Sequence, residues 1–123
     1  MILIKNIEVF SPQSLGKKNI LIFYNKIAYI SSEVNLPDKN FPEIKVIDGE
    51  GLTVVPGLID LHVHITGGGG EGGFTTRAPE LTLTNLTMNG ITTCIGLLGT
   101  DGTTRSMGNL IAKARALEEE GLS

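Results

Sequence analysis

The apolar pattern of the chain changes near Pro56-Gly57, and this change limits the possible folds more than any other feature. Residues 1–55 contain short β-branched runs separated by turn-forming residues, without helical periodicity. They predict a first domain that is a small antiparallel sheet or half of a β-sandwich. The predicted strands cover residues 2–4, 7–10, 20–24, 27–30, 44–47 and 52–55.

Residues 56–123 predict a second domain with the order strand, helix, strand, helix, which is typical of an α/β fold with a parallel sheet. Because sheets average about five or six strands, we expect this domain to be incomplete at Ser123, with the outer edge of its second strand unpaired. The predicted strands cover 58–65 and 91–98, the helices 79–89 and 106–120, and a long glycine-rich loop 66–78.

Composition excludes several classes of partner. The chain has 13 acidic and 10 basic residues and a net charge of −3, which argues against a nucleic acid or an anionic membrane. Its apolar runs of about five residues are far shorter than the roughly 20 that span a bilayer. The single cysteine, Cys94, excludes an internal disulfide and fits a reducing compartment, so we predict a cytoplasmic protein.

The segment 58–65 alternates strictly between apolar and polar side chains. In an extended strand, Asp60, His62 and His64 share one face, and the two histidines lie about 6.6 Å apart at their Cα atoms. Two imidazoles at this spacing can converge on one zinc ion, and Asp60 could orient a ligand. The alternative is a solvated polar face, but an unoccupied polar row on an otherwise apolar strand is costly. Zinc normally needs three or four protein ligands, and the chain has no further histidine.

Six glycines lie between Gly67 and Gly73, directly after the histidine strand. Serial glycines let backbone N–H groups approach a ligand closely, although no nucleotide-binding motif is present. Glu71 is the only charge among them and could receive a substrate ammonium; the alternative is a flexible loop with a solvated glutamate. After the second strand, Thr100 could donate to a carboxylate, but an ordinary turn at 100–102 is the simpler interpretation. We expect Arg77 and Arg105 to be solvated loop charges.

The run Val-Pro-Gly-Leu-Ile-Asp-Leu-His-Val-His at 55–64 resembles a motif of the amidohydrolase superfamily. There, P-G-x-I-D-x-H-x-H leads from a β-sandwich into the first strand of a (β/α)8 barrel. The stretches 62–71, 75–80, 90–93 and 96–101 resemble the isoaspartyl dipeptidases of that superfamily. The resemblance implies an α/β fold, with a β-sandwich portion at 1–55 and the first two β/α units of a metal-dependent TIM barrel at 56–123.

The same resemblance implies roles for five residues. His62 and His64 would bind the more buried ion of a two-zinc centre, and Glu71 would bind the free α-ammonium of a β-aspartyl dipeptide. The Gly69 backbone and Thr100 would help hold the aspartyl carboxylate. In this family a hydroxide between two zinc ions attacks the isopeptide carbonyl. No catalytic residue is expected within this chain, because the proton-shuttling aspartate and the bridging lysine would lie further downstream.

We therefore predict the N-terminal part of a zinc-dependent isoaspartyl dipeptidase that forms a homo-oligomer and is inactive as residues 1–123 alone. One alternative is a non-catalytic remnant that folds by oligomerisation or by complementation with another fragment. Another is a hydantoinase-like or deacetylase-like amidohydrolase, against which Glu71 in its glycine setting and Thr100 both argue.

Overall fold

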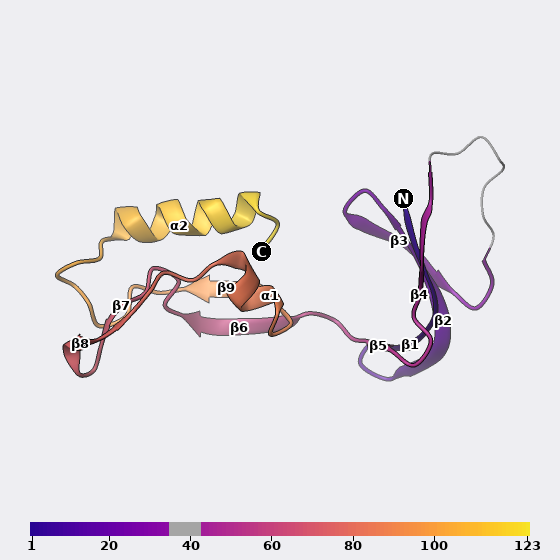
Figure 1. Cartoon of the computed structure of the whole chain (residues 1–123), viewed down its shortest axis with the longest axis horizontal. Helices are drawn as coiled ribbons and strands as arrows, with labels where there is room; N and C mark the ends of the chain where they lie inside the picture. The colour runs from indigo at the N-terminus through magenta and orange to yellow at the C-terminus, as the bar shows by residue number, and fades with distance from the viewer. Residues whose placement is uncertain (35–42) are drawn as a thin grey trace. The chain divides into compact units, whose positions relative to one another are not determined.

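The computed structural model describes residues 1–34 and 43–123, which form two compact units, Met1–Pro56 and Gly57–Ser123 (Figure 1). Within the described residues, no helix has both the length and the apolar character needed to cross a membrane.

The first unit is a five-stranded sheet in the order β3-β2-β1-β4, with β5 also paired to β1. β1 to β3 form an antiparallel meander, whereas β4 and β5 run parallel to β1, so the prediction of an antiparallel sheet is wrong for these two strands. Both run along the edge of β1 that β2 leaves open, and a turn at 49–52 separates them. The strands are β1 (Ile2–Phe10), β2 (Ser14–Phe23), β3 (Lys26–Ser31), β4 (Lys45–Asp48) and β5 (Thr53–Val54).

β1 is one continuous strand, although the sequence predicts two strands, at 2–4 and 7–10, with a gap at residues 5 and 6. The register of β1 against β2 shifts between Ile4 and Ile7, and Asn6 has a φ of 59° at this irregularity. Asparagine tolerates this left-handed conformation better than most residues. The core of the unit contains Ile7, Val9 and Ile20.

The second unit confirms the predicted order of strand, helix, strand and helix. Two strands pair in parallel, and α2 runs alongside β9 (Figure 1). The first helix starts later than predicted, because Asn85 Oδ1 accepts a hydrogen bond of 2.8 Å from the backbone N–H of Thr82 and fixes the start there. These elements are β6 (Leu58–Val63), α1 (Leu83–Thr87), β9 (Ile91–Gly96) and α2 (Met107–Glu119).

The glycine-rich segment is an antiparallel hairpin rather than the predicted loop. Its strands are β7 (Gly68–Gly70) and β8 (Gly73–Ala78), joined by a turn at Glu71 and Gly72. Glycine disfavours strands intrinsically, so the sequence of β7 carries no strand signal. Pairing with the threonine-containing strand β8 satisfies its backbone instead.

The core of the second unit lies between the sheet and its helices. Ile59 and Leu61, which share a strand face with the buried Val63, are each 66% exposed. The apolar side chains of α2 are buried only in part: Leu110 and Leu117 are buried, whereas Met107 and Ile111 are exposed. The buried core residues are Val63, Ile65, Leu86, Leu110, Leu117 and Leu122.

The outer edge of β9 is not entirely unpaired, contrary to the prediction. The N–H of Ser123 donates to the Thr92 carbonyl over 3.1 Å, and the N–H of Cys94 donates to the Ser123 carbonyl over 2.8 Å. In a parallel pair of strands, one residue donates to the residue before its partner and accepts from the residue after it, as Ser123 does around Thr93. Ser123 therefore occupies the position of a third parallel strand.

Candidate functional site

The loops that follow β6 and β9 border an open pocket with a volume of about 570 Å³. The carboxyl ends of parallel strands meet at one edge of a sheet, which is where α/β folds bind ligands. Four of the five residues predicted for the site line this pocket, and Gly69 lines two neighbouring pockets. The residues of the pocket are His62, His64, Gly70, Glu71, Leu97, Leu98, Gly99 and Thr100.

His62 lies in β6 and His64 follows just after its end, and both side chains are exposed. Their ring centroids are 5.3 Å apart, with an angle of 46° between the ring planes. Asp60 Oδ1 accepts a hydrogen bond of 3.0 Å from the backbone N–H of His62. The structure thus gives Asp60 a backbone partner in its own strand.

Gly99 lies against the His64 imidazole. Its φ is +75°, and a Cβ atom added there would lie 2.7 Å from His64 Nδ1, closer than real Cβ contacts occur. Any other residue at position 99 would therefore combine a strained backbone with a displaced imidazole. The sequence marks Gly99 only as a turn residue and gives no sign of this contact.

The histidine pair fits part of a zinc site. Neutral imidazoles are common zinc ligands, and both rings line one solvent-accessible pocket. Among residues 1–34 and 43–123, however, no group of three or more His, Cys, Asp or Glu side chains could hold a metal ion. The two imidazoles are therefore suited to be two members of a larger ligand set.

Glu71 and Thr100 reach the pocket from different loops. Glu71 lies at the exposed turn of the β7–β8 hairpin. Thr100 Oγ1 donates to the Gly69 carbonyl over 3.0 Å, and the Gly69 N–H donates to Asp101 Oδ2 over 2.9 Å. Both backbone polar groups of Gly69 are thus engaged within the protein.

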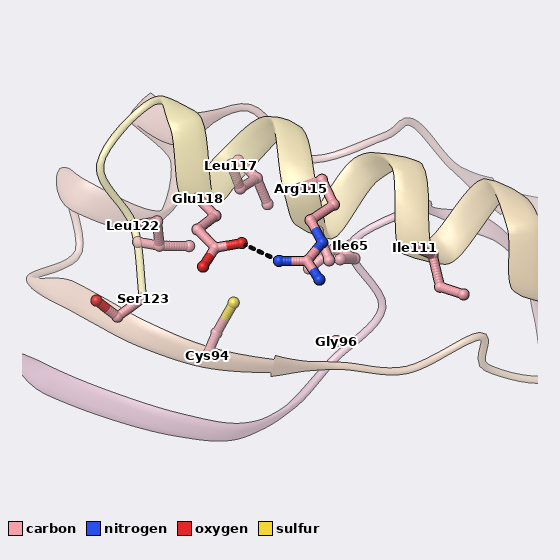
Figure 2. A pocket seen from close by; sticks show the side chains of 10 residues that line it. Ile65, Cys94, Gly96, Ile111, Arg115, Leu117, Glu118, Leu122 and Ser123 are labelled. Atoms are coloured by element: carbon pink, nitrogen blue, oxygen red, sulfur yellow. Dashed lines mark hydrogen bonds and ion pairs between the residues drawn. The ribbon is translucent and has the colours of Figure 1, made fainter.

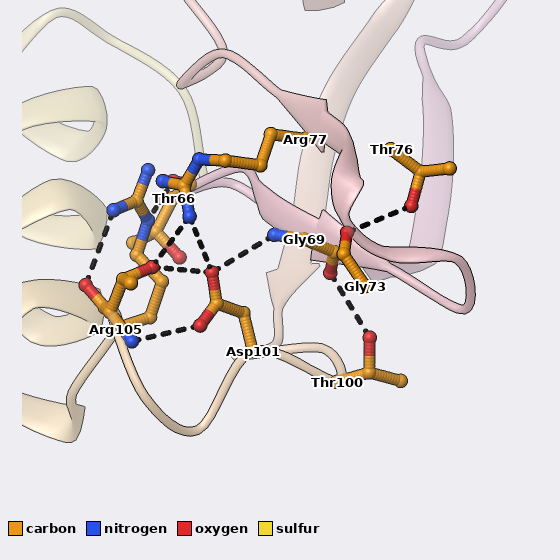
Figure 3. A network of polar contacts seen from close by, with 9 residues as sticks. Thr66, Gly69, Gly73, Thr76, Arg77, Thr100, Asp101 and Arg105 are labelled. Atoms are coloured by element: carbon orange, nitrogen blue, oxygen red, sulfur yellow. Dashed lines mark hydrogen bonds and ion pairs between the residues drawn. The ribbon is translucent and has the colours of Figure 1, made fainter.

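Asp101 is a central residue that the sequence interpretation missed (Figure 3). Its side chain is 3% exposed, so the predicted turn is correct locally but the carboxylate is buried. The hydrogen bond from the Thr104 hydroxyl, then those from the backbone N–H groups of Gly69 and Thr104, hold the pKa of Asp101 well below its usual range. The nearby Arg77 adds a smaller effect in the same direction, and burial opposes it.

The two arginines expected to be solvated both have partners in the protein. Arg77 Nη1 lies 3.0 Å from Asp101 Oδ2, and Arg105 Nε donates to the Thr66 carbonyl over 2.6 Å. Nothing in the sequence separates these arginines from solvated ones, because their partners lie 24 and 39 residues away.

A second pocket, of about 350 Å³, lies beneath α2 and holds none of the predicted site residues (Figure 2). The side chains that line it are largely apolar, and Cys94 is among them. Burial, with a smaller contribution from the charge of Asp60, raises the pKa of the Cys94 thiol. This is the chemistry of a core cysteine rather than of a nucleophile.

The known proteins to which the chain is similar belong to one enzyme class. No family model matches it. The dihydroorotase of Staphylococcus epidermidis is 38% identical over 93 residues, which cover 64% of this chain and 21% of that protein. A D-hydantoinase structure from Thermus sp. aligns with a TM-score of 0.61 and 26% identity, over 98% of this chain and 24% of the other. These proteins are amidohydrolases.

The chain is also similar to a β-aspartyl dipeptidase of that class. The structure of this enzyme from Fervidobacterium islandicum AW-1, in complex with a β-Asp-Leu dipeptide, is 54% identical with a TM-score of 0.84. The alignment covers 99% of this chain and 31% of that one, and a second structure of that enzyme gives a TM-score of 0.85. The chain is similar to the N-terminal portion of β-aspartyl dipeptidases, as its sequence predicts, and spans about a third of their length.

Proposed function

We propose that this chain forms the N-terminal part of a zinc-dependent β-aspartyl dipeptidase. The observation that carries the proposal is the pocket that His62, His64, Glu71 and Thr100 line together. The similarity to an enzyme solved with β-Asp-Leu supports the same substrate class here. The parallel pair β6–β9, its helices and the bridge made by Ser123 support the start of a (β/α)8 barrel at residues 56–123, after a β-sandwich portion at 1–55.

In this proposal His62 and His64 hold a zinc ion together with ligands from elsewhere in a longer chain. When bound, zinc supplies a Lewis acid for the isopeptide carbonyl and activates water for attack. Residues 1–123 alone are expected to be inactive, because two imidazoles do not form a complete zinc site and the general base lies outside this segment.

Glu71 is proposed to bind the substrate's α-ammonium group. Its carboxylate is exposed at the pocket and forms no ion pair with any other described residue. A carboxylate without an ion-pair partner in the described residues is able to bind the free α-ammonium group of a dipeptide. The cyclic amides that dihydroorotases and hydantoinases hydrolyse have no such amine, so Glu71 would lack a partner with them.

Thr100 is proposed to hold the aspartyl carboxylate. A hydroxyl hydrogen rotates freely, so Thr100 can donate to a substrate oxygen in place of the Gly69 carbonyl. The Gly69 N–H already donates to Asp101, so Gly69 helps by setting the position of Thr100 and of the hairpin.

Replacing Glu71 by Gln tests the substrate assignment. A hydrogen bond to a charged group contributes about 1.5–3 kcal/mol, so kcat/KM for β-Asp-Leu should fall between about 10- and 150-fold. The measurement uses protein expressed from the complete reading frame, with bound zinc determined in parallel.

Zinc content should stay unchanged in Glu71→Gln, because its proposed partner is the substrate and not the metal. Glu118→Gln is the matched control, because Glu118 is exposed, pairs with Arg115 at the pocket beneath α2 and does not line the pocket of the histidine pair. Loss of zinc in parallel with activity would overturn the role of Glu71.

A further inference from the structure

The buried carboxylate of Asp101 binds the glycine hairpin to the loop that follows β9 (Figure 3). Oδ2 accepts from the Gly69 N–H at 2.9 Å, from Arg77 Nη1 at 3.0 Å and from the Thr104 hydroxyl. Oδ1 accepts from the Thr104 N–H at 2.8 Å. Gly69 belongs to β7 and Arg77 to β8, so one side chain contacts both strands of the hairpin.

The close approach of the hairpin to Asp101 depends on glycine. At Gly68, where φ is +109°, an added Cβ atom would lie 3.0 Å from Asp101 Oδ2 and 3.1 Å from Asp101 Cβ. At Gly69 it would lie 3.1 Å from the Gly73 carbonyl oxygen. The glycines that look like a flexible loop therefore allow a tight contact between two loops.

The contact is electrostatically complete. A buried carboxylate without partners is costly, but Asp101 has four hydrogen bonds, and the one from the partly exposed Arg77 is also an ion pair. Arg77 Nη1 also donates to Thr104 Oγ1 over 2.9 Å, which closes the network. At the base of the hairpin, Arg105 donates to the Thr66 carbonyl.

We propose that Asp101 is a positioning residue for the substrate pocket. It fixes the hairpin, so that Gly69 lies beside Thr100, whose hydroxyl donates to the Gly69 carbonyl over 3.0 Å until substrate replaces that acceptor, and Glu71 stays at the pocket with the histidine pair. Asp101 itself does not line that pocket. The effect on substrate rests on the proposed function, whereas the ordering of the hairpin does not.

Asp101→Asn is the sharpest variant because it keeps the shape of the side chain. Each carboxylate oxygen faces at least one donor, so the amide nitrogen opposes a donor in either orientation. We expect KM for β-Asp-Leu to rise about tenfold or more, with kcat and zinc content within about twofold of wild type. Hydrogen exchange of residues 67–78 should accelerate.

The exchange measurement separates this inference from the proposed function. If wild-type protein does not hydrolyse β-Asp-Leu but Asp101→Asn still accelerates exchange at 67–78, the proposed function fails and the positioning role stands. Unchanged exchange and unchanged KM would overturn the inference, and so would loss of zinc together with activity. Glu118→Gln serves as the control that changes neither quantity.

A milder variant keeps the inference testable if Asp101→Asn does not fold. Thr104→Ala removes the hydroxyl that donates to Asp101 and accepts from Arg77 Nη1, and leaves the Gly69, Arg77 and backbone contacts of Asp101 in place. It should raise KM by about threefold and accelerate exchange in the same segment to a smaller extent. If Asp101→Asn is unfolded and Thr104→Ala has the hydrogen-exchange rates and the KM of wild type, the positioning role is overturned.

Discussion

Replacing Gly99 by Ala should weaken zinc binding through His64 without unfolding the protein. The added Cβ atom would lie 2.7 Å from His64 Nδ1 and 2.9 Å from Cε1. Ordinary contacts start near 3.4 Å, so the imidazole must move by roughly 0.7 Å. Metal–ligand distances tolerate only about 0.2 Å, so a shift of this size disturbs the ligand.

The substitution at Gly99 has two consequences, and only one of them lowers zinc affinity. Alanine at a φ of +75° costs about 1–2 kcal/mol of folding free energy, which lowers stability but does not act on the metal. Disturbing a group that orients a metal ligand typically costs 10- to 100-fold in metal affinity. We therefore expect zinc affinity to fall by about that factor.

Gly16→Ala is the matched control for the backbone contribution. Gly16 has a φ of +72°, and a Cβ atom added there meets nothing within 4 Å. Competition with a chromophoric chelator measures zinc affinity in both variants of the protein from the complete reading frame. Gly99→Ala should bind zinc 10- to 100-fold more weakly and Gly16→Ala should match wild type. Equal affinities in the two variants would refute the steric argument at His64.

Two further predictions follow from Asp101 and from the exposed apolar side chains. Folding lowers the pKa of Asp101, so its ionised carboxylate stabilises the folded state. This stabilisation is fully present above the pKa of aspartate in the unfolded chain, about 3.9, and is lost as the pH falls below that value. The difference in unfolding free energy between wild type and Asp101→Asn should thus be constant from about pH 7 to 5 and shrink below about pH 4. A free-energy difference that stays the same below about pH 4 would contradict this prediction. Residues 1–123 alone should self-associate in light scattering, because Ile59, Leu61 and Ile111 are exposed, and a monomer at high concentration would contradict this.

The elements of the second unit could be predicted because their signals are local. The alternation at 58–65 and the stripe on α2 depend only on the periods of strand and helix. The histidine pair follows from the same alternation, and the structure places both rings at one pocket. In the first unit, the direction of β4 and β5 is set by pairing with β1, which no local pattern specifies.

The hairpin and the Asp101 network could not be predicted, for a related reason. A run of glycines has the same composition whether it is mobile or packed, and the difference lies in the close contact of Gly68 with Asp101. An aspartate in a turn also looks the same whether solvated or buried. Only the contacts of Asp101 with Gly69 and Arg77, 32 and 24 residues away, identify it as a buried group.

The most direct test of the proposed function compares two dipeptides that differ only in the linkage of aspartate. Zinc-loaded protein from the complete reading frame is incubated with β-Asp-Leu and with α-Asp-Leu, and released leucine is measured over time. The site described above predicts release from β-Asp-Leu and none above background from α-Asp-Leu. Equal rates for both peptides, or no release from β-Asp-Leu, would contradict the assignment as a β-aspartyl dipeptidase.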